Sequence, residues 1–278
     1  DKRWGRAYEG FSENPDVVAR LGAAAIRGLQ GSDLSNPHSV LGCAKHFVAD
    51  GGTVPELRES HHGDLDAGVR LRLDQGDAQI DEKSLRKIHL APYSDAIAAG
   101  VGSIMPSYSS WNGDKCTGSY YLLTEILKEE LGFEGFVISD FAAIDQVDPD
   151  YKTAIAKSIN AGIDMGMVPW RHKEFHRLLC ELVKEGKVPM ERIDDAVTRI
   201  LRVKAAMAMF EEPYQYKADR SLHASFSSDE HHQTARQAVR ESLVVLKNDN
   251  QTLPRSLELK RKMRRCAAAT DLGEHSGG

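Results

Sequence analysis

The chain has 278 residues, of which 41% are hydrophobic and 28% are charged, a composition typical of a folded globular protein. Its formal net charge of −5 gives no general attraction to nucleic acid or to anionic lipid, so neither is expected as a partner. No apolar run approaches the length that crosses a bilayer. The cysteines Cys43, Cys116, Cys180 and Cys266 lack the spacing of a zinc site or disulfide framework, which favours thiols.

The first predicted helix and strand follow each other near the start of the chain. Asp16–Leu29 has helical spacing, with Pro15 suited to its opening turn and Gly31 as its stop. Val40–Phe47 is a short apolar run that predicts a buried strand. Together they form one unit of a repeating pattern.

The same alternation continues through the first two-thirds of the chain. Helical periodicity and short apolar runs follow each other, as expected of repeated β/α units around a parallel sheet. The predicted helices are Ser84–Ala99, Leu122–Leu131 and Ala154–Ala161, and the predicted strands are Val101–Met105, Gly135–Ile138 and Ile163–Val168. This order predicts an α/β barrel.

A change of composition marks the end of the predicted barrel. Two more amphipathic helices, His172–Glu185 and Met190–Phe210, precede the Pro- and Ser-containing stretch Glu211–Ser228. Asp229–Asn248 then begins with a helix. We therefore predict a barrel domain over 1–210, a linker over 211–228 and the beginning of a second domain over 229–278.

Polar residues follow several of the predicted strands. Lys45, His46, Tyr108 and Asp140 all lie at strand ends. In an α/β barrel the active site is assembled at the C-terminal ends of the strands, so these four are expected to share one rim. A retaining glycosidase needs a carboxylate beneath the anomeric carbon, and Asp140 fits that role. An Asp after a strand is equally suited to cap a helix.

The other candidates also have two interpretations each. Lys45 and His46 can donate to vicinal sugar hydroxyls, but such a pair can also be a solvated strand end, and Lys45 could form a Schiff base in an aldolase. Asp50 could accept from sugar hydroxyls or from Lys45, or belong to an ordinary Asp-Gly-Gly turn. Tyr108 could bond a nucleophilic carboxylate, and Arg6 could grip paired hydroxyls or simply pair with a nearby Glu.

Five stretches of the chain form a set of motifs in a fixed order. They are Arg3–Glu13 (RWGRAYEGFSE), Cys43–Thr53 (CAKHFVADGGT), Ser103–Gly113 (SIMPSYSSWNG), Gly132–Asp140 (GFEGFVISD) and Glu241–Pro254 (ESLVVLKNDNQTLP). Taken together, these motifs resemble glycoside hydrolase family 3, especially its β-glucosidase and exo-β-glucanase branch, and the resemblance spans nearly the whole chain. Long ordered matches are far more specific than any single tripeptide.

The resemblance implies a (β/α)8 TIM barrel, incomplete at its N-terminal end, followed by the start of an α/β sandwich domain. It implies a retaining β-glucosidase that releases terminal non-reducing β-D-glucosyl residues, without a metal or organic cofactor. Its substrates would be β-linked glucosides or short β-glucan oligosaccharides, and its location periplasmic or extracellular. β-Xylosidase, β-N-acetylglucosaminidase and a catalytically impaired glycan-binding fragment remain alternatives.

Roles for individual residues follow from the same resemblance. Asp140 matches the family's nucleophile, which forms a covalent glycosyl-enzyme. Arg6, Lys45, His46 and Tyr108 match positions that hold the non-reducing glucose. Beyond the resemblance, we expect Asp50 to help position the sugar. Met167 matches a residue that lines the pocket, and Phe141 occupies a position that usually carries Trp and helps to bind the next sugar.

The chain also departs from the family's pattern. The segment Glu56–Leu73 is expected to be an inserted loop near the pocket mouth, with no assigned role. The family's general acid/base is a Glu that would lie beyond Gly278, so low activity is expected of this chain alone, since such groups contribute about 10²–10⁴-fold. His61 or His62 with a nearby Asp is a rival acid that the spacing does not favour.

Overall fold

The computed structural model describes residues 4–59, 69–211 and 220–251. The contacts divide the chain into two compact units, Asp1–Tyr216 and Lys217–Gly278. The predicted domain bounds of 1–210, 211–228 and 229–278 stay predictions. All of the predicted site residues belong to the first unit.

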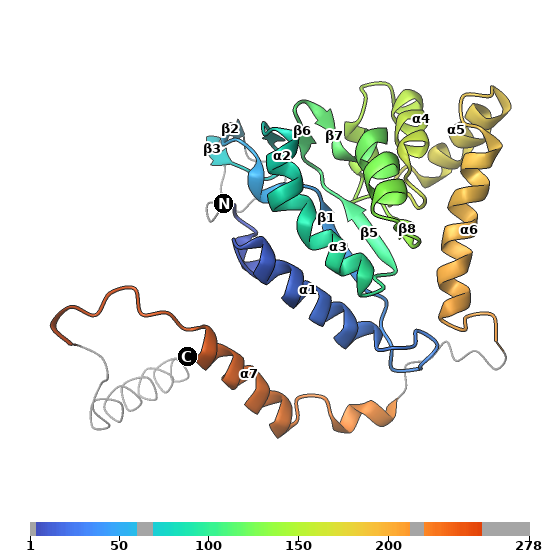
Figure 1. The fold of residues 1–278 in the computed structure, drawn as a ribbon. Helices are drawn as coiled ribbons and strands as arrows, with labels where there is room; N and C mark the ends of the chain where they lie inside the picture. The colour runs from blue at the N-terminus through green and yellow to red at the C-terminus, as the bar shows by residue number, and fades with distance from the viewer. Residues whose placement is uncertain (1–3, 60–68, 212–219, 252–278) are drawn as a thin grey trace, which may run out of the picture. The chain divides into compact units, whose positions relative to one another are not determined.

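A parallel sheet forms the centre of the first unit. Its strands are β1 (Cys43–Phe47), β5 (Ser103–Pro106) and β8 (Phe136–Val137), in the order β1-β5-β8 (Figure 1). Both pairings are parallel, with Ala44 opposite Ile104 and Ile104 opposite Val137. The next predicted strand, Ile163–Val168, is reduced to a single parallel bridge between Ile138 and Met165. The predicted α/β architecture with a parallel sheet is therefore confirmed.

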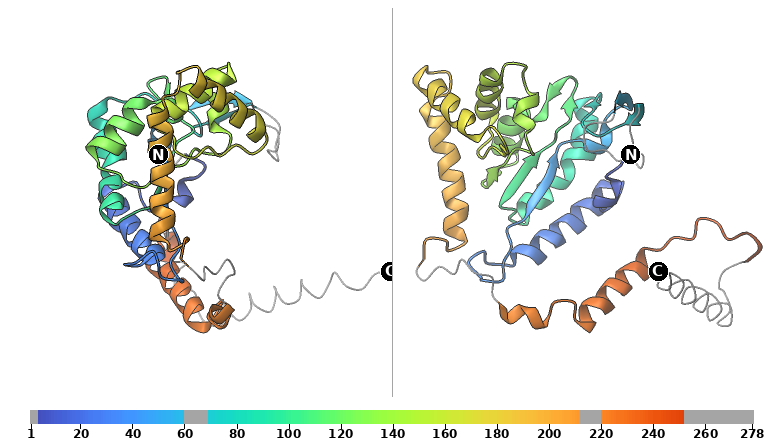
Figure 2. Two further views of the ribbon diagram at one scale, coloured as in Figure 1. Left: turned by 90° about the vertical axis from the view of Figure 1, so that its right-hand side faces the viewer. Right: turned by 180° about the vertical axis from the view of Figure 1, so that it is seen from behind.

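Helices α1 (Pro15–Gln30) and α3 (Ala91–Ala98) pack side by side over one face of the sheet (Figures 1 and 2). The predicted signals of α1 are confirmed. Pro15 stands in its first turn, the Asn14 side chain accepts from the Asp16 N–H, and Gly31 ends the helix with φ 65°. Because only glycine adopts this φ easily, the stop is set by the sequence.

The predicted helix Ser84–Ala99 is present but irregular. It consists of α2 (Glu82–Ser84), the π-type helix η3 (Leu85–Leu90) and α3. Pro92 stands in the first turn of α3 and has no N–H to donate to the preceding turn, which accounts for a change of hydrogen bonding there. The predicted helix Leu122–Leu131 is likewise π-type, η5 (Tyr121–Glu130).

Three longer helices complete the first unit. They are α4 (Tyr151–Ala161), α5 (His172–Lys184) and α6 (Met190–Ala206). The prediction that the last helix reaches Phe210 is wrong, because Ala208 has φ 54°, which an L-residue in a helix does not adopt. The core between helices and sheet is apolar, with Ile104, Val137 and Ile163 fully buried.

Shorter elements connect these parts. The predicted inserted loop Glu56–Leu73 contains two paired antiparallel strands, β2 (Glu56–Glu59) and β3 (Val69–Arg72), so the loop prediction is corrected there. His61 and His62 lie outside the described residues. A second small sheet joins β4 (Asp77–Ala78), β6 (Ser110–Trp111) and β7 (Asp114–Lys115). The short helices are η1 (Ala7–Glu9), η2 (Asp50–Gly52), η4 (Cys116–Gly118) and η6 (Ala143–Gln146).

The described part of the second unit holds η7 (Arg220–Ala224), α7 (Asp229–Ser242) and η8 (Asp249–Gln251). Leu243 to Leu246 follow α7 with exposed side chains.

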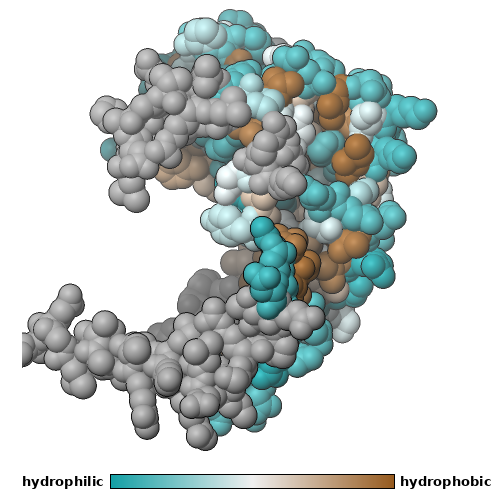
Figure 3. All heavy atoms as spheres, turned by 90° about the vertical axis from the view of Figure 1, so that its left-hand side faces the viewer, coloured by the Kyte–Doolittle hydropathy of each residue, from teal (hydrophilic) through white to brown (hydrophobic). Residues whose placement is uncertain are grey.

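None of the helices in the described ranges is long and apolar enough to cross a membrane. On the face drawn in Figure 3, apolar residues are scattered among polar ones, as on most protein surfaces.

Candidate active site

His46 lies between two carboxylates at the C-terminal edge of the sheet. Its Nδ1 is 2.6 Å from Asp50 Oδ2, and its Nε2 is 3.6 Å from Asp140 Oδ2. The side chains of His46, Asp50 and Asp140 are 6%, 13% and 16% exposed, respectively. β1 carries His46 and β8 leads to Asp140, and β5 separates the two strands, so the edge brings distant segments together as predicted.

Asp50 has both carboxylate oxygens occupied by protein donors. Oδ2 bonds His46, and Oδ1 accepts a short hydrogen bond from the Ser107 hydroxyl. Among the described residues, Asp50 makes no hydrogen bond to Lys45. Of the alternatives given for Asp50, a contact with Lys45 is therefore not observed, and the Asp50 carboxylate lies beside the imidazole of His46.

A serine hydroxyl also organises the turn that carries Asp140. Ser139 is fully buried, and its Oγ accepts the N–H of Met167 at 2.8 Å. The Ser139 N–H donates to the Met165 carbonyl at 2.9 Å. Asp140 Oδ1 accepts from the Phe141 N–H at 2.6 Å. Met167 is thereby fixed next to the turn of the proposed nucleophile.

Tyr108 follows β5 and reaches the same turn. Its hydroxyl donates to the carbonyl oxygen of Phe141, where the sequence led us to expect a bond to the Asp140 carboxylate. Burial and then the negative charge of Asp140 raise the pKa of Tyr108 to about 12. The phenol is therefore a neutral donor in the ordinary pH range, and it holds the backbone next to Asp140.

The two predicted cations, Arg6 and Lys45, are placed differently. Arg6 donates to both carboxylate oxygens of Glu9 at 2.7 Å, as in an ordinary surface ion pair. This hydrogen bonding raises the pKa of Arg6, and Asp74 and Asp50 add to it from a distance. Lys45 is exposed and has no ion pair with the described residues, but its charge helps to lower the pKa of Glu9, after the larger effect of Arg6.

Exposed aromatic rings lie next to the carboxylate. Phe141 is 48% exposed and packs edge-on against Trp170, which is 73% exposed, with ring centroids 5.1 Å apart. Trp111 on β6 instead stacks on Tyr121, and its Nε1 donates to the Ile80 carbonyl at 2.8 Å. Trp111 is therefore a structural residue, and Trp170 is the aromatic that sequence reasoning missed.

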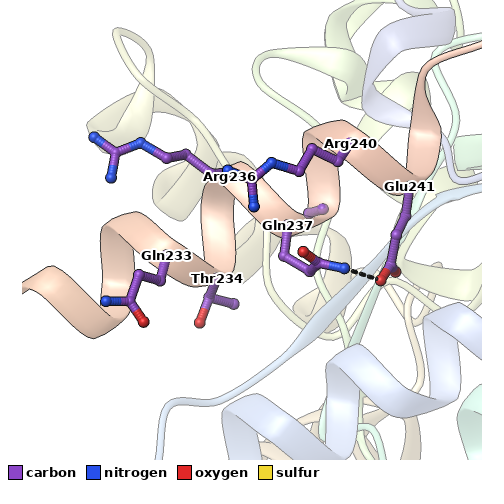
Figure 4. Close-up of a pocket in the computed structure, with 7 residues that line it drawn as sticks. Gln233, Thr234, Arg236, Gln237, Arg240 and Glu241 are labelled. Carbon is purple, nitrogen blue, oxygen red and sulfur yellow. Dashed lines mark hydrogen bonds between the residues drawn. The ribbon is translucent and has the colours of Figure 1, made fainter.

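Elsewhere in the described part of the chain we find no comparable group of catalytic side chains. Among residues 4–59, 69–211 and 220–251, no cluster of His, Cys, Asp or Glu has the geometry of a metal site. Cys43, Cys116 and Cys180 are free thiols, as predicted, and Cys266 lies outside the described residues. The pocket in Figure 4 is lined only by residues of α7, among them Gln237 and Glu241, whose side chains bond each other at 2.5 Å. Glu241 is the one carboxylate in the lining of this pocket, and a glycosidase site of the kind described above needs two.

The chain matches known glycoside hydrolases in sequence and structure. It is 31% identical over 262 residues to a periplasmic beta-glucosidase of Salmonella typhimurium, covering 91% of this chain and 32% of that protein. It is 33% identical over 267 residues to a beta-xylosidase of Formosa agariphila, covering 91% and 34%. A variant of the exo-1,3/1,4-beta-glucanase of a Pseudoalteromonas species superposes with a TM-score of 0.80 at 40% identity, covering 92% and 39%.

The chain thus spans about a third of the length of the curated relatives it matches. The family model for the glycosyl hydrolase family 3 N terminal domain matches residues 1–203. That match contains every residue of the candidate site, from Arg6 to Trp170. This chain belongs to glycoside hydrolase family 3.

Proposed function

We propose that the protein is a retaining β-glucosidase in which Asp140 is the nucleophile. The observation that carries this proposal is the close approach of Asp140 and His46 at the C-terminal edge of the sheet, 3.6 Å between Oδ2 and Nε2. Relatives with the names beta-glucosidase and exo-beta-glucanase support the reaction class. The sheet is then a sector of a (β/α)8 barrel, whose active sites lie at this end.

The proposed reaction has two steps. Asp140 attacks the anomeric carbon of a terminal β-D-glucosyl residue, the bond to the leaving oxygen breaks, and a covalent glycosyl-enzyme forms. Water then releases glucose with the β configuration retained. A second acid must protonate the leaving oxygen, and no described residue of the site is assigned that role.

The remaining side chains hold the sugar. Lys45 is exposed at the edge and can donate to a sugar hydroxyl near the nucleophile, and His46 can hydrogen-bond another through Nε2, which faces Asp140. Arg6 is bound to Glu9 and would contribute through that pair. Phe141 and Trp170 offer apolar faces to the group that leaves. The substrates would be β-linked glucosides or short β-glucan oligosaccharides, met in the periplasm or outside the cell.

Covalent labelling tests the nucleophile. A 2-deoxy-2-fluoro-β-glucoside with a good leaving group should label the protein, and peptide mapping should find the sugar on Asp140. Asp140→Asn should not be labelled, whereas Asp145→Asn, which changes a carboxylate on η6, should be. Label on another residue would refute the assignment.

β-Xylosidase is the second candidate, because a beta-xylosidase is 33% identical over 91% of this chain. The two sugars differ in the hydroxymethyl group at C5, so the ratio of kcat/KM for aryl β-glucoside and aryl β-xyloside decides between them. A preference for glucoside supports the main proposal. A preference for xyloside would keep Asp140 as nucleophile but change the substrate.

A further inference from the structure

Ser107 is a buried serine whose hydroxyl bonds a residue of the candidate site, Asp50. It follows β5 and is fully buried. Its Oγ donates to Asp50 Oδ1 and accepts the N–H of Ser109 at 2.9 Å. Its own N–H donates to the Phe47 carbonyl at 2.6 Å, which ties the ends of β1 and β5 together. No sugar can reach this hydroxyl, so any role in the reaction is indirect.

An unbroken chain of contacts leads from Ser107 to Asp140. The Ser107 hydroxyl contacts Asp50, Asp50 contacts His46 Nδ1 at 2.6 Å, and His46 Nε2 faces Asp140 at 3.6 Å. An ionised carboxylate only accepts, so the proton of this pair lies on Nδ1. Nε2 is then the nitrogen presented to the site, and its direction depends on how firmly Asp50 is held.

The turn that carries Asp50 is itself closely packed. A Cβ on Gly52 would lie 2.7 Å from His89 Nε2, so the ring of His89 fills the space against the backbone of this turn. The Thr53 hydroxyl donates to the Leu73 carbonyl at 2.5 Å. The backbone of η2 is therefore fixed, and Ser107 removes the remaining freedom of the Asp50 side chain.

We propose that Ser107 and Asp50 are positioning residues that orient the His46 imidazole, and that Asp50 acts through His46 and not as a ligand of the sugar. This inference rests on the proposed function of the same site. It assigns Ser107, which no sugar contacts, a specific effect on turnover. The effect should be present only while His46 is present.

A double-mutant cycle tests that dependence. We expect Ser107→Ala to lower kcat/KM for an aryl β-glucoside about tenfold to hundredfold, because a small misplacement of a binding group costs that much. In a His46→Gln background the same substitution should change kcat/KM less than about threefold, since contacting residues are coupled and unconnected ones are additive. Equal losses in both backgrounds would overturn the inference.

Imidazole NMR gives a readout that does not need turnover. In protein with ¹⁵N-labelled histidine, the signals absent from His46→Gln identify His46. We expect its Nδ1–H proton to resonate downfield in the unchanged protein and to shift upfield or broaden in Ser107→Ala. An unchanged imidazole spectrum would overturn the positioning role. If no variant hydrolyses glucosides, the proposed function fails, and these spectra still decide the role of Ser107.

Two matched variants control for the loss of a buried hydroxyl. Ser103 lies at the other end of β5, where its Oγ donates to the Gly42 carbonyl at 3.0 Å. Ser158 is fully buried in α4, and its hydroxyl has no hydrogen-bond partner within the described part of the chain. Ser103→Ala and Ser158→Ala should leave both kcat/KM and the His46 spectrum unchanged. If either reproduces the Ser107→Ala effects, a general loss of stability explains them.

Discussion

His46 Nε2 lies 3.6 Å from Asp140 Oδ2, with β5 between the strands that carry the two residues. In retaining glycosidases the nucleophile and the acid are about 5–5.5 Å apart, on opposite faces of the sugar. His46 is closer to Asp140 than that, so in the proposed mechanism His46 lies on the same side of the sugar as Asp140. It is placed to hold a hydroxyl there, and not to protonate the leaving oxygen.

His46→Gln should therefore weaken turnover without changing its stereochemistry. A hydrogen bond that involves a charged group contributes about 1.5–3 kcal/mol, which corresponds to a loss of about 10–150-fold in kcat/KM. Proton NMR of the first product should still show the β anomer. His38→Gln, in the loop after α1, should retain full activity. A change to the α anomer would contradict this role.

The Phe141–Trp170 pair should set affinity for the leaving group. Aromatic contacts of this kind contribute about 0.5–1.5 kcal/mol, so Trp170→Ala should raise KM for laminaribiose about 2–10-fold. It should hardly affect methyl β-glucoside, which has no second sugar to stack. Trp111→Phe should lower stability and leave both KM values alone. An equal rise of KM for both substrates would argue against stacking.

A buried ion network beneath β8 should dominate local stability. Asp164 is 0% exposed in its side chain and bonds Lys128 at 2.8 Å, Arg192 and the Val137 N–H. Asp164→Asn leaves Lys128 and Arg192 with Asp195 as their counter-charge, a carboxylate that is 43% exposed, and should lower the free energy of unfolding by up to about 3–5 kcal/mol. Urea denaturation measures this loss.

The matched control for that network is an ion pair nearer to water. Asp148 pairs with Lys157 at 2.5 Å, but the lysine side chain is 53% exposed. Asp148→Asn should shift the urea midpoint far less than Asp164→Asn does, because solvent-exposed ion pairs contribute little to stability. Equal urea midpoints for the Asp164 and Asp148 variants would show that the buried network is not stabilising.

Alkaline pH should destabilise the protein through Tyr108. Its pKa is raised from 10.0 to about 12, first by burial, so above pH 10 the unfolded chain releases the phenolic proton while the folded state keeps it. The free energy of unfolding then falls as pH rises toward 12. Tyr108 is only half-buried, so water screening keeps the effect small. The free energy of unfolding should decrease less steeply with pH in Tyr108→Phe than in the unchanged protein. In the control variant Tyr120→Phe, which changes an exposed tyrosine, it should decrease as steeply as in the unchanged protein.

The rim of the site was predictable, because parallel strands bring their C-terminal ends to one edge. Lys45, His46 and Asp140 each follow an apolar run, and this fixes their place without knowledge of any side-chain contact. The signals that begin and end α1, Pro15 and Gly31, were similarly local. Features that are set by residues adjacent in the sequence, such as strand ends and helix ends, are the ones that the sequence specifies most directly.

The supporting contacts were not predictable. Ser107 and Ser139 are common residues, and only the folded structure shows that their hydroxyls bond Asp50 and the Met167 N–H. Tyr108 has the expected place but bonds a backbone carbonyl, since its partner is chosen by distances between strands. Trp170 follows a Pro in a segment without periodicity, so nothing local indicates that it meets Phe141.

The last residue of α1 has a consequence for engineering. Gln30 is buried, and its amide bonds the Gly100 carbonyl at 2.7 Å and the N–H groups of Gly42 and Gly102 at 2.9 and 3.1 Å. The side chain of Gln30, the residue before the loop of residues 31–41, thus bonds the backbone of Gly42, the residue after the loop. Foreign peptide inserted near Asn36 should leave the strands in register, which makes this loop a practical attachment point for reporters far from the chemistry.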